Sequence, residues 1–217
     1  LPARMRGRAS LLTAMFAEVV EQAARAASVD PGRLPSVLGS AYGEMGTTLG
    51  LLAQLAAAGE QLSPSKFQAS VHNTAAGQLS IALRNASFST SLAAGHDTLA
   101  MSLLEACAWL AVHPGQLLLA CAEEGASSVL QPEAAYLPLA AAFVLASAAP
   151  PGAAVARLHA PEPQRREPRP GCERDNPLAP ALALARAAFS GDRVTLQVNE
   201  ASAFGYAIQV ESFRRSP

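Results

Sequence analysis

The side chains best suited to chemistry are a histidine and an aspartate that follow a run of hydroxyl groups. His96 and Asp97 come shortly after the stretch that contains Ser89 and Ser91. A Ser-His-Asp set would catalyse acyl transfer or hydrolysis if the three groups converged in space. The sequence around Ser91 lacks the Gly-x-Ser-x-Gly string that exposes such a nucleophile. The simpler interpretation is that Asp97 and Thr98 cap the helix that begins here.

Three glycines within residues 43–50 suggest a phosphate-binding loop. Gly43, Gly46 and Gly50 precede an apolar stretch. The segment has neither the Gly-Lys-Ser/Thr of a P-loop nor the spacing of a dinucleotide fingerprint. We therefore expect a tight connection from a strand to a helix, in which the glycines allow close packing.

The other histidines and the cysteines indicate no metal site, no cofactor and no disulfide framework. They are scattered along the chain without Cys-x-x-Cys spacing, which favours a reducing, cytoplasmic location. Cys107 and Cys121 fall in apolar stretches and are expected to act as small hydrophobic residues. The full set is His72, His113, His159, Cys107, Cys121 and Cys172.

Composition limits the classes of protein that fit. Of the 217 residues, 50% are hydrophobic and 15% are charged, with 16 basic side chains against 17 acidic ones. This composition excludes a disordered chain, and the charge balance disfavours a nucleic-acid binder. Residues 134–156 carry no charge, but Pro138, Pro150, Pro151 and Gly152 interrupt them. The uninterrupted part is too short to span a membrane and suits a buried strand or core helix.

Hydrophobic periodicity predicts alternating helices and strands. Helices are expected over residues 9–27, 47–58, 74–84, 96–112 and 178–189, with a short one starting at Ser63-Pro64. Strands are expected over residues 34–38, 86–91, 116–122, 137–147, 153–158, 193–198 and 204–211. Residues 137–147 and 153–158 would form a hairpin through Pro150-Pro151-Gly152. This order favours an α/β layered sandwich.

A polar segment divides the chain. Residues 161–177 are rich in Pro, Arg and Glu and almost free of apolar side chains, which is typical of an exposed loop or linker. We therefore divide the chain into a domain over residues 1–160, a Pro/Arg-rich loop or linker over 161–177, and a C-terminal helix and strand pair over 178–217. The last part would complete the same domain.

Several strings occur in the order found in β-ketoacyl synthases. The segment 63–82 opens with Ser63-Pro64 and places Ala75-Ala76-Gly77 after Asn73. It resembles the stretch before the synthase nucleophile. Residues 85–96 look like the nucleophile strand and turn, and residues 117–124 resemble a later core strand ending in Glu. Over residues 1–158 the chain is similar to short β-ketoacyl synthase N-terminal-like proteins, often associated with aryl polyene pigments.

The resemblance implies a fold and the loss of an activity. It implies an α/β, thiolase-like layered half, a mixed sheet flanked by helices, truncated relative to a full ketosynthase. The nucleophilic Cys of that family would fall on Ala94, between Ala93 and Gly95. A methyl group cannot attack a thioester, so acyl-enzyme chemistry there is impossible. The family's catalytic histidines belong to a second half with no recognisable counterpart in this sequence. Residues 199–206 are weakly similar to its Gly-Phe-Gly loop.

By family analogy the chain is a non-catalytic, chain-length-factor-like subunit in fatty acyl, aryl polyene or polyketide elongation. Its partners would be a catalytic ketosynthase or a second copy, and acyl carrier protein. The candidates for the acyl cavity or the interface are Val71, His72, Asn73, Gln78, Phe88, Thr90, Leu92 and Gly95. Two alternatives remain. One is an acyl-thioester hydrolase or transferase that uses Ser91, His96 and Asp97. The other is a purely structural interaction module.

Overall fold

The computed structural model describes residues 7, 9–57, 62–148 and 153–213. Its α-helices are α2 (Leu11–Ala27), α3 (Met45–Ala56), α4 (Pro64–Gln68), α5 (Thr74–Leu83), α6 (Thr98–Val112) and α7 (Ala179–Ala188). Its strands are β1 (Ser36–Gly39), β2 (Ser89–Leu92), β3 (Gln116–Glu123), β4 (Leu139–Ala146), β5 (Ala156–Leu158), β6 (Glu162–Arg165), β7 (Arg193–Val198) and β8 (Phe204–Ser212). Short 3₁₀ turns are η1 (Pro31–Arg33), η2 (Gly95–Asp97) and η3 (Cys172–Arg174).

The first sheet is mixed and has the strand order β2-β1-β3-β4. Strand β1 runs parallel to both β2 and β3, and β4 runs antiparallel to β3. The central strand β3 is buried on both faces, as its continuous apolar sequence predicts. Alternate side chains enter different cores: Leu117 and Leu119 pack toward α6 and α7, whereas Leu118 and Ala120 pack toward α2 and α5. This alternation is the period of two expected of a strand.

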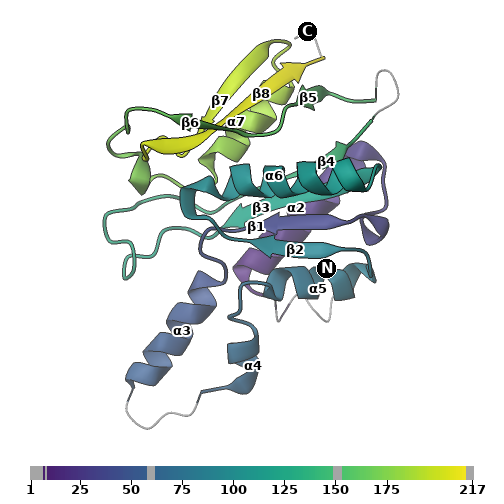
Figure 1. Cartoon of the computed structure of the whole chain (residues 1–217). Helices are drawn as coiled ribbons and strands as arrows, with labels where there is room; N and C mark the ends of the chain where they lie inside the picture. The colour runs from purple at the N-terminus through teal and green to yellow at the C-terminus, as the bar shows by residue number, and fades with distance from the viewer. Residues whose placement is uncertain (1–6, 8, 58–61, 149–152, 214–217) are drawn as a thin grey trace.

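The second sheet is antiparallel throughout. Strand β8 pairs with β7 along one side, and with β5 and β6 at the two ends of its other side. Helix α7 packs on β7 and β8, and its residues join those of α6 in one hydrophobic core. The layers are therefore α2 and α5, the first sheet, α6 and α7, and the second sheet (Figure 1). The expected α/β class with a mixed sheet flanked by helices is confirmed.

Two expectations about the later part of the chain are wrong. Strands β4 and β5 do not form a hairpin, because β4 pairs with β3 in the first sheet and β5 pairs with β8 in the second. The Pro-Pro-Gly connection itself lies outside the described residues. Within the expected loop over residues 161–177, residues 162–165 form the exposed strand β6, which takes its backbone partners from β8. Local composition reveals neither pairing, because both depend on distant residues.

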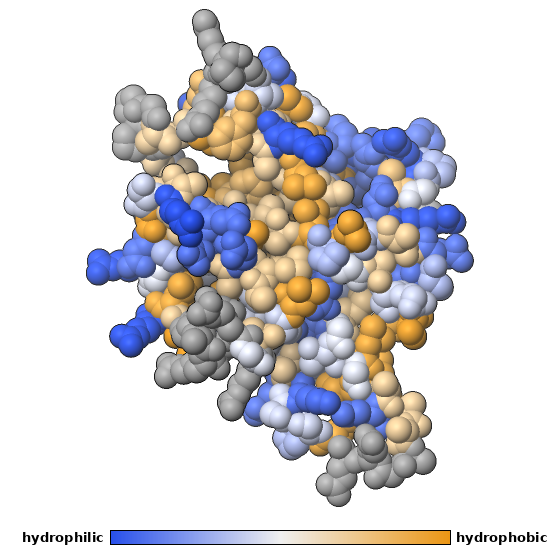
Figure 2. Space-filling model, turned by 180° about the vertical axis from the view of Figure 1, so that it is seen from behind, coloured by the Kyte–Doolittle hydropathy of each residue, from blue (hydrophilic) through white to orange (hydrophobic). Residues whose placement is uncertain are grey.

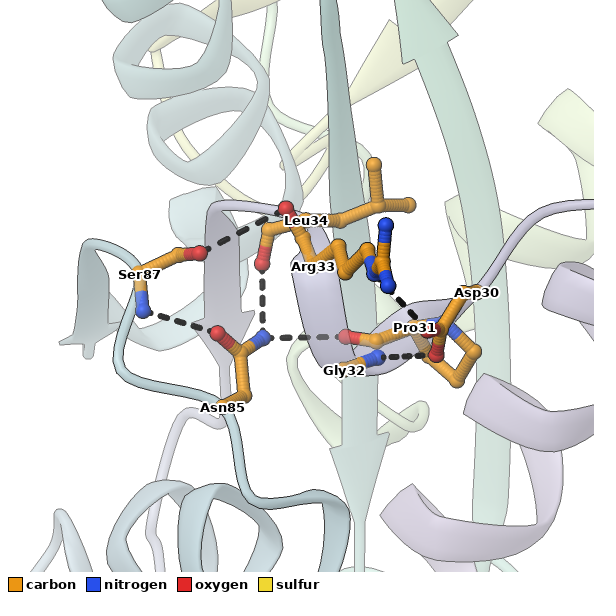
Figure 3. A network of polar contacts seen from close by, with 7 residues as sticks. All are labelled: Asp30, Pro31, Gly32, Arg33, Leu34, Asn85 and Ser87. Carbon is orange, nitrogen blue, oxygen red and sulfur yellow. Dashed lines mark hydrogen bonds and ion pairs between the residues drawn. The ribbon is translucent and has the colours of Figure 1, made fainter.

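An asparagine holds the starts of β1 and β2 together. The Asn85 side chain donates from Nδ2 to the carbonyl oxygens of Pro31, at 2.9 Å, and Leu34, at 2.8 Å. Its Oδ1 accepts from the backbone N–H of Ser87 at 2.8 Å. Figure 3 shows this network, in which Asp30 also accepts from the η1 backbone. The network fixes where β2 begins. It therefore also helps to fix the turn that follows the C-terminal end of this short strand.

Candidate functional site

The turn that follows β2 is tight and closely bonded; residues 93–97 are called the Ala94 turn below. Gly95 has a φ of +53°, in the region that favours glycine. Thr98 accepts from the Ala94 N–H at 3.0 Å and donates to the Gly95 carbonyl oxygen at 2.7 Å. The Thr98 side chain is fully buried at the start of α6, so the turn is fixed to the helix. Ala94 is half-buried, and its methyl group offers no nucleophile.

Asp97 connects this turn to the far end of the chain. Its Oδ2 accepts from Asn199 Nδ2 at 2.9 Å, and Asn199 has a φ of +59° in the connection between β7 and β8. The other carboxylate oxygen, Oδ1, is buried and has no hydrogen-bond partner among the described residues. Asp97 makes no side-chain capping bond to α6, so the expected cap is not formed by this carboxylate. The turn is instead joined to the second sheet.

A surface pocket of about 400 Å³ opens beside Asp97. Strands β6 and β8 supply its other walls, so it lies between the Ala94 turn and the second sheet. Gly205 is required in that wall, because a Cβ there would overlap the Arg166 guanidinium and the Val198 carbonyl oxygen. The lining residues are Asp97, Pro163, Gln164, Arg165, Phe204, Gly205 and Tyr206.

Three buried carboxylates, those of Glu44, Glu123 and Glu124, lie near the C-terminal ends of β1 and β3. Glu123 accepts at Oε2 from the N–H groups of Ala41, at 2.6 Å, and Tyr42, at 3.3 Å. Burial raises the pKa of Glu123 to about 7; the hydrogen bonds it accepts oppose the rise, and the charge of Glu124 adds to it. Burial also raises the pKa of Glu44.

Glu124 and Glu44 hold the starts of two helices. Glu124 accepts from the Leu12 N–H at the start of α2, at 3.3 Å, and from the Gly46 N–H at the start of α3, at 2.7 Å. Glu44 accepts from the Thr13 hydroxyl at 3.2 Å. From the sequence, Glu123 and Glu124 are expected only to end a strand. The sequence did contain a signal for their burial. Two acidic residues directly follow a wholly apolar run, and the end of such a central strand is itself buried.

The described residues contain no group of three or more His, Cys, Asp or Glu side chains arranged to hold a metal ion. Burial raises the pKa of the Cys121 thiol to about 12 and also raises that of Cys107. Both thiols therefore stay neutral, as expected of small hydrophobic residues. Among the same residues, no helix is long and apolar enough to cross a membrane.

The sequence matches the family model described as the N-terminal domain of β-ketoacyl synthase over residues 1–204. The chain belongs to the β-ketoacyl synthase family. The search of curated proteins found no match.

Two solved structures have the same fold as this β-ketoacyl synthase family member. One is a ketosynthase (ApeO) in complex with its chain length factor (ApeC) from Xenorhabdus doucetiae, with a TM-score of 0.71 and 23% identity. That match covers 96% of this chain and 81% of the other. The second is AntDE:AntF, a type II polyketide synthase acyl-carrier protein in complex with its ketosynthase bound to the hexaketide. It gives a TM-score of 0.75 and 13% identity, over 98% of this chain and 87% of the other. These likenesses establish the ketosynthase, thiolase-like fold.

In this family member the three candidate hydrolase residues do not form a relay. Ser91 lies in β2, opposite Leu38 of β1, and His96 lies in η2. No hydrogen bond among the described residues joins Ser91 or His96 to Asp97, whose bonded partner is Asn199. The arrangement thus has neither a nucleophile–base bond nor a base–carboxylate bond.

The candidate interface residues lie along two neighbouring elements of the family fold. Val71, His72 and Asn73 precede α5, which lies beside β2 (Figure 1). His72 contacts the Ser40 carbonyl oxygen through Nε2 at 2.8 Å, so it supports a loop as well. Phe88 stacks on Trp109 of α6 with ring centroids 3.9 Å apart. The remaining candidates are Gln78 on α5, Thr90 and Leu92 on β2, and Gly95 in the turn.

Helices α3 and α4 extend away from the layered body, as Figure 1 shows at its lower left; together they are called the α3–α4 arm. Helix α3 carries no charged residue. Its Leu52 and Leu55 are 47% and 61% exposed, and Phe67 of α4 is 59% exposed. Val71, just after α4, is also exposed. Leu52 and Leu55 are three positions apart and therefore lie on one face of α3.

Proposed function

We propose that this chain is a non-catalytic β-ketoacyl synthase family subunit that binds a catalytic ketosynthase and influences the length of the acyl chain made on acyl carrier protein. The observation that carries the proposal is Ala94. It lies in a tight turn between a parallel strand and the N-terminal end of a buried helix, where the family resemblance puts the nucleophilic Cys. A methyl group there leaves a ketosynthase-like subunit without acyl transfer.

The α3–α4 arm supports a role in binding. Leu55 and Phe67 are more than half exposed on two helices that leave the body. A monomer gains nothing from exposing apolar side chains together, whereas a partner that covers them removes their surface from water. Strand β2 supports the same role, because within the described residues it pairs only with β1 and leaves one edge open. An open strand edge can pair with another chain.

The similar folds agree with this role. The chain spans most of the length of two similar chains, one from a complex of a ketosynthase with its chain length factor and one from a complex of a ketosynthase with its acyl-carrier protein. We extend those partner classes to this chain: a catalytic ketosynthase, or a second copy, and acyl carrier protein. We also propose that the chain works in the cytoplasm, on fatty acyl, aryl polyene or polyketide chains, and that the C-terminal residues complete the same domain.

Complex formation tests the proposal. The tagged chain is co-expressed with each candidate ketosynthase of its own organism, and complexes are isolated by affinity and gel filtration. We expect a stoichiometric complex with one of them, weakened at least tenfold by Leu55→Glu, because that change buries a charge against an apolar partner. Val129→Glu is the matched control, since Val129 is 74% exposed and belongs to the connection between β3 and β4 instead of α3 or α4. Absence of a complex with every ketosynthase would contradict the proposal.

A further inference from the structure

The loop that leads from β1 to the arm, residues 40–44, is gripped from two sides. On one side Glu123 Oε2 accepts from Ser40 Oγ at 3.1 Å, besides the two N–H groups already described. On the other side His72 Nε2 lies 2.8 Å from the Ser40 carbonyl oxygen. Gly43 fits closely beneath the imidazole, because a Cβ there would lie 2.9 Å from His72 Cδ2, and its φ is +64°. The path of the chain into the arm is therefore set at Ser40.

The grip depends on a carboxylate in a costly position. Glu123 is only 1% exposed, and its second oxygen, Oε1, is buried without a hydrogen-bond partner among the described residues. The pKa of Glu123 is raised to about 7 by burial first and by the charge of Glu124 last. An unpaired buried charge is expensive, so the folded loop favours the protonated acid over the ion.

The titratable groups around this carboxyl add no compensating positive charge. Four titratable groups interact with it electrostatically: Cys121 of β3, Glu124 directly after β3, Tyr42 of the gripped loop and Tyr136 of the loop before β4. Glu44 of the gripped loop is coupled to Glu124, and His72 reaches the loop from beyond α4. Among the described residues no Lys or Arg is paired with Glu123.

The hydrogen bonds next to Glu123 connect the loop over residues 40–44 to the start of the arm. Gly46, at the beginning of α3, donates to Glu124, the residue next to Glu123 on the same strand end. Glu123 at the end of β3 and the adjacent Glu124 thus accept hydrogen bonds from the segment between Ser40 and Gly46, which leads into the first turn of α3. If the hydrogen bonds at Ala41 and Tyr42 loosen, the start of α3 keeps the Gly46–Glu124 bond and the bonds that Glu44 accepts from the Ser10 and Thr13 hydroxyls.

We propose that Glu123 is a proton-sensitive latch that sets how firmly the α3–α4 arm is held to the body. The closed loop binds the proton more tightly than an opened loop, in which the carboxyl would be hydrated. Linkage therefore makes acid favour the closed loop, and a rise of pH through neutrality favours opening. The role of the arm as a partner surface rests on the proposed function; the latch itself does not.

Amide hydrogen exchange on the full chain tests the latch without any partner. We expect the protection factors of the Ala41 and Tyr42 amides to fall about tenfold between pH 6 and pH 8, from the difference between a folded pKa of about 7 and an unfolded one of 4.5. In Glu123→Gln most of this fall should disappear. Glu21→Gln, which alters an exposed carboxylate of α2, is the control and should behave like the wild type.

A second measurement needs no variant. In the wild-type protein the ¹³C shift of the Glu123 carboxyl should titrate near pH 7, and the protection of Ala41 should fall from about pH 4.5 and level off above the carboxyl titration. Protection that goes on falling well above the carboxyl titration, a wild-type loop indifferent to pH, or an equal fall in Glu123→Gln would each overturn the latch. Failure to bind a ketosynthase would leave all these readouts unchanged, so the two proposals fail separately.

Discussion

Asn199 donates a hydrogen bond from Nδ2 to Oδ2 of Asp97 across 2.9 Å, although 102 positions separate the two residues. The bond joins the Ala94 turn of the first sheet to the β7–β8 connection of the second. It also fixes Asp97, which lines the 400 Å³ pocket, relative to the second sheet, whose strands β6 and β8 line the rest of that pocket. The turn where we expect the family's nucleophile position to fall is therefore fixed from both sheets.

The Asp97–Asn199 bond should be measurable as a coupling energy. Asp97→Ala and Asn199→Gly are combined in a double-mutant cycle, with the free energy of unfolding obtained from urea titrations. Glycine is chosen because Asn199 has a positive φ, so strain does not add to the loss. We expect a coupling energy of about 1–2 kcal/mol, as for a hydrogen bond to a charged group. Purely additive losses would show that the bond does not link the sheets.

Asn85 should be among the most sensitive polar residues. Asn85→Ala removes two donated bonds and one accepted bond from a half-buried site, so we expect a loss of about 2 kcal/mol in the free energy of unfolding. Asn85→Asp should be at least as harmful, because it turns an oxygen toward the carbonyls of Pro31 and Leu34. Ser65→Ala, at an exposed hydroxyl on α4, serves as the control. Equal stability of the Ala and wild-type proteins would contradict this role.

The stability of the protein should fall as the pH rises through neutrality. The folded pKa of Glu123 is raised to about 7 from 4.5, so its contribution is complete below pH 4.5 and is lost as the pH passes 7. Between pH 6 and pH 8 the loss should be about 1 kcal/mol, and Glu123→Gln should remove most of it. Thermal or urea unfolding at several pH values measures this slope. A slope of opposite sign in that window, or one unchanged by the substitution, would refute it.

The Ala94 turn should accept a thiol that becomes reactive. In a background of Cys107→Ser and Cys172→Ser, Ala94→Cys places a thiol near the N-terminal end of α6, where N–H groups favour a thiolate. We expect iodoacetamide to label this site at least tenfold faster than the buried Cys121. Labelling rates followed by peptide mass spectrometry give the comparison. A thiol as inert as Cys121 would show that the turn does not have the environment of a nucleophile.

The unmodified chain should not turn over acyl-thioesters. Ser91 and His96 make no bonded relay with Asp97, so hydrolysis of acyl-pantetheine substrates should match the protein-free rate. His96→Ala should leave that rate unchanged. Turnover that disappears in His96→Ala would instead establish the hydrolase or transferase alternative.

Local features of this fold could be predicted from the sequence, and its pairings could not. The strand, turn and helix around Ala94 depend on neighbours in the chain, so residues 85–112 indicated them. The hairpin expected through Pro150-Pro151-Gly152 was wrong because a turn-like connection does not determine which strand its neighbours pair with. Strand β6 was missed because its polar residues obtain their order from β8.

The buried carboxylates illustrate the same limit at the level of the site. Glu123 and Glu124 are ordinary charged residues until the fold encloses them with Ala41 and Gly46. Conversely, the sequence indicated an apolar second helix, but only the structure places α3 outside the layers, with Leu55 exposed. Figure 2, which shows the molecule from behind relative to Figure 1, also has apolar surface across the middle of that face.

The most direct test of the central claim is the length of the product made by a reconstituted elongation system. The partner ketosynthase, its acyl carrier protein and the required reductive enzymes are assayed with and without this chain, and the carrier-bound products are sized by mass spectrometry. We expect that adding the chain changes the length distribution or the rate, and that Leu55→Glu abolishes the effect while Val129→Glu does not. Identical product lengths and rates with and without the chain would contradict it.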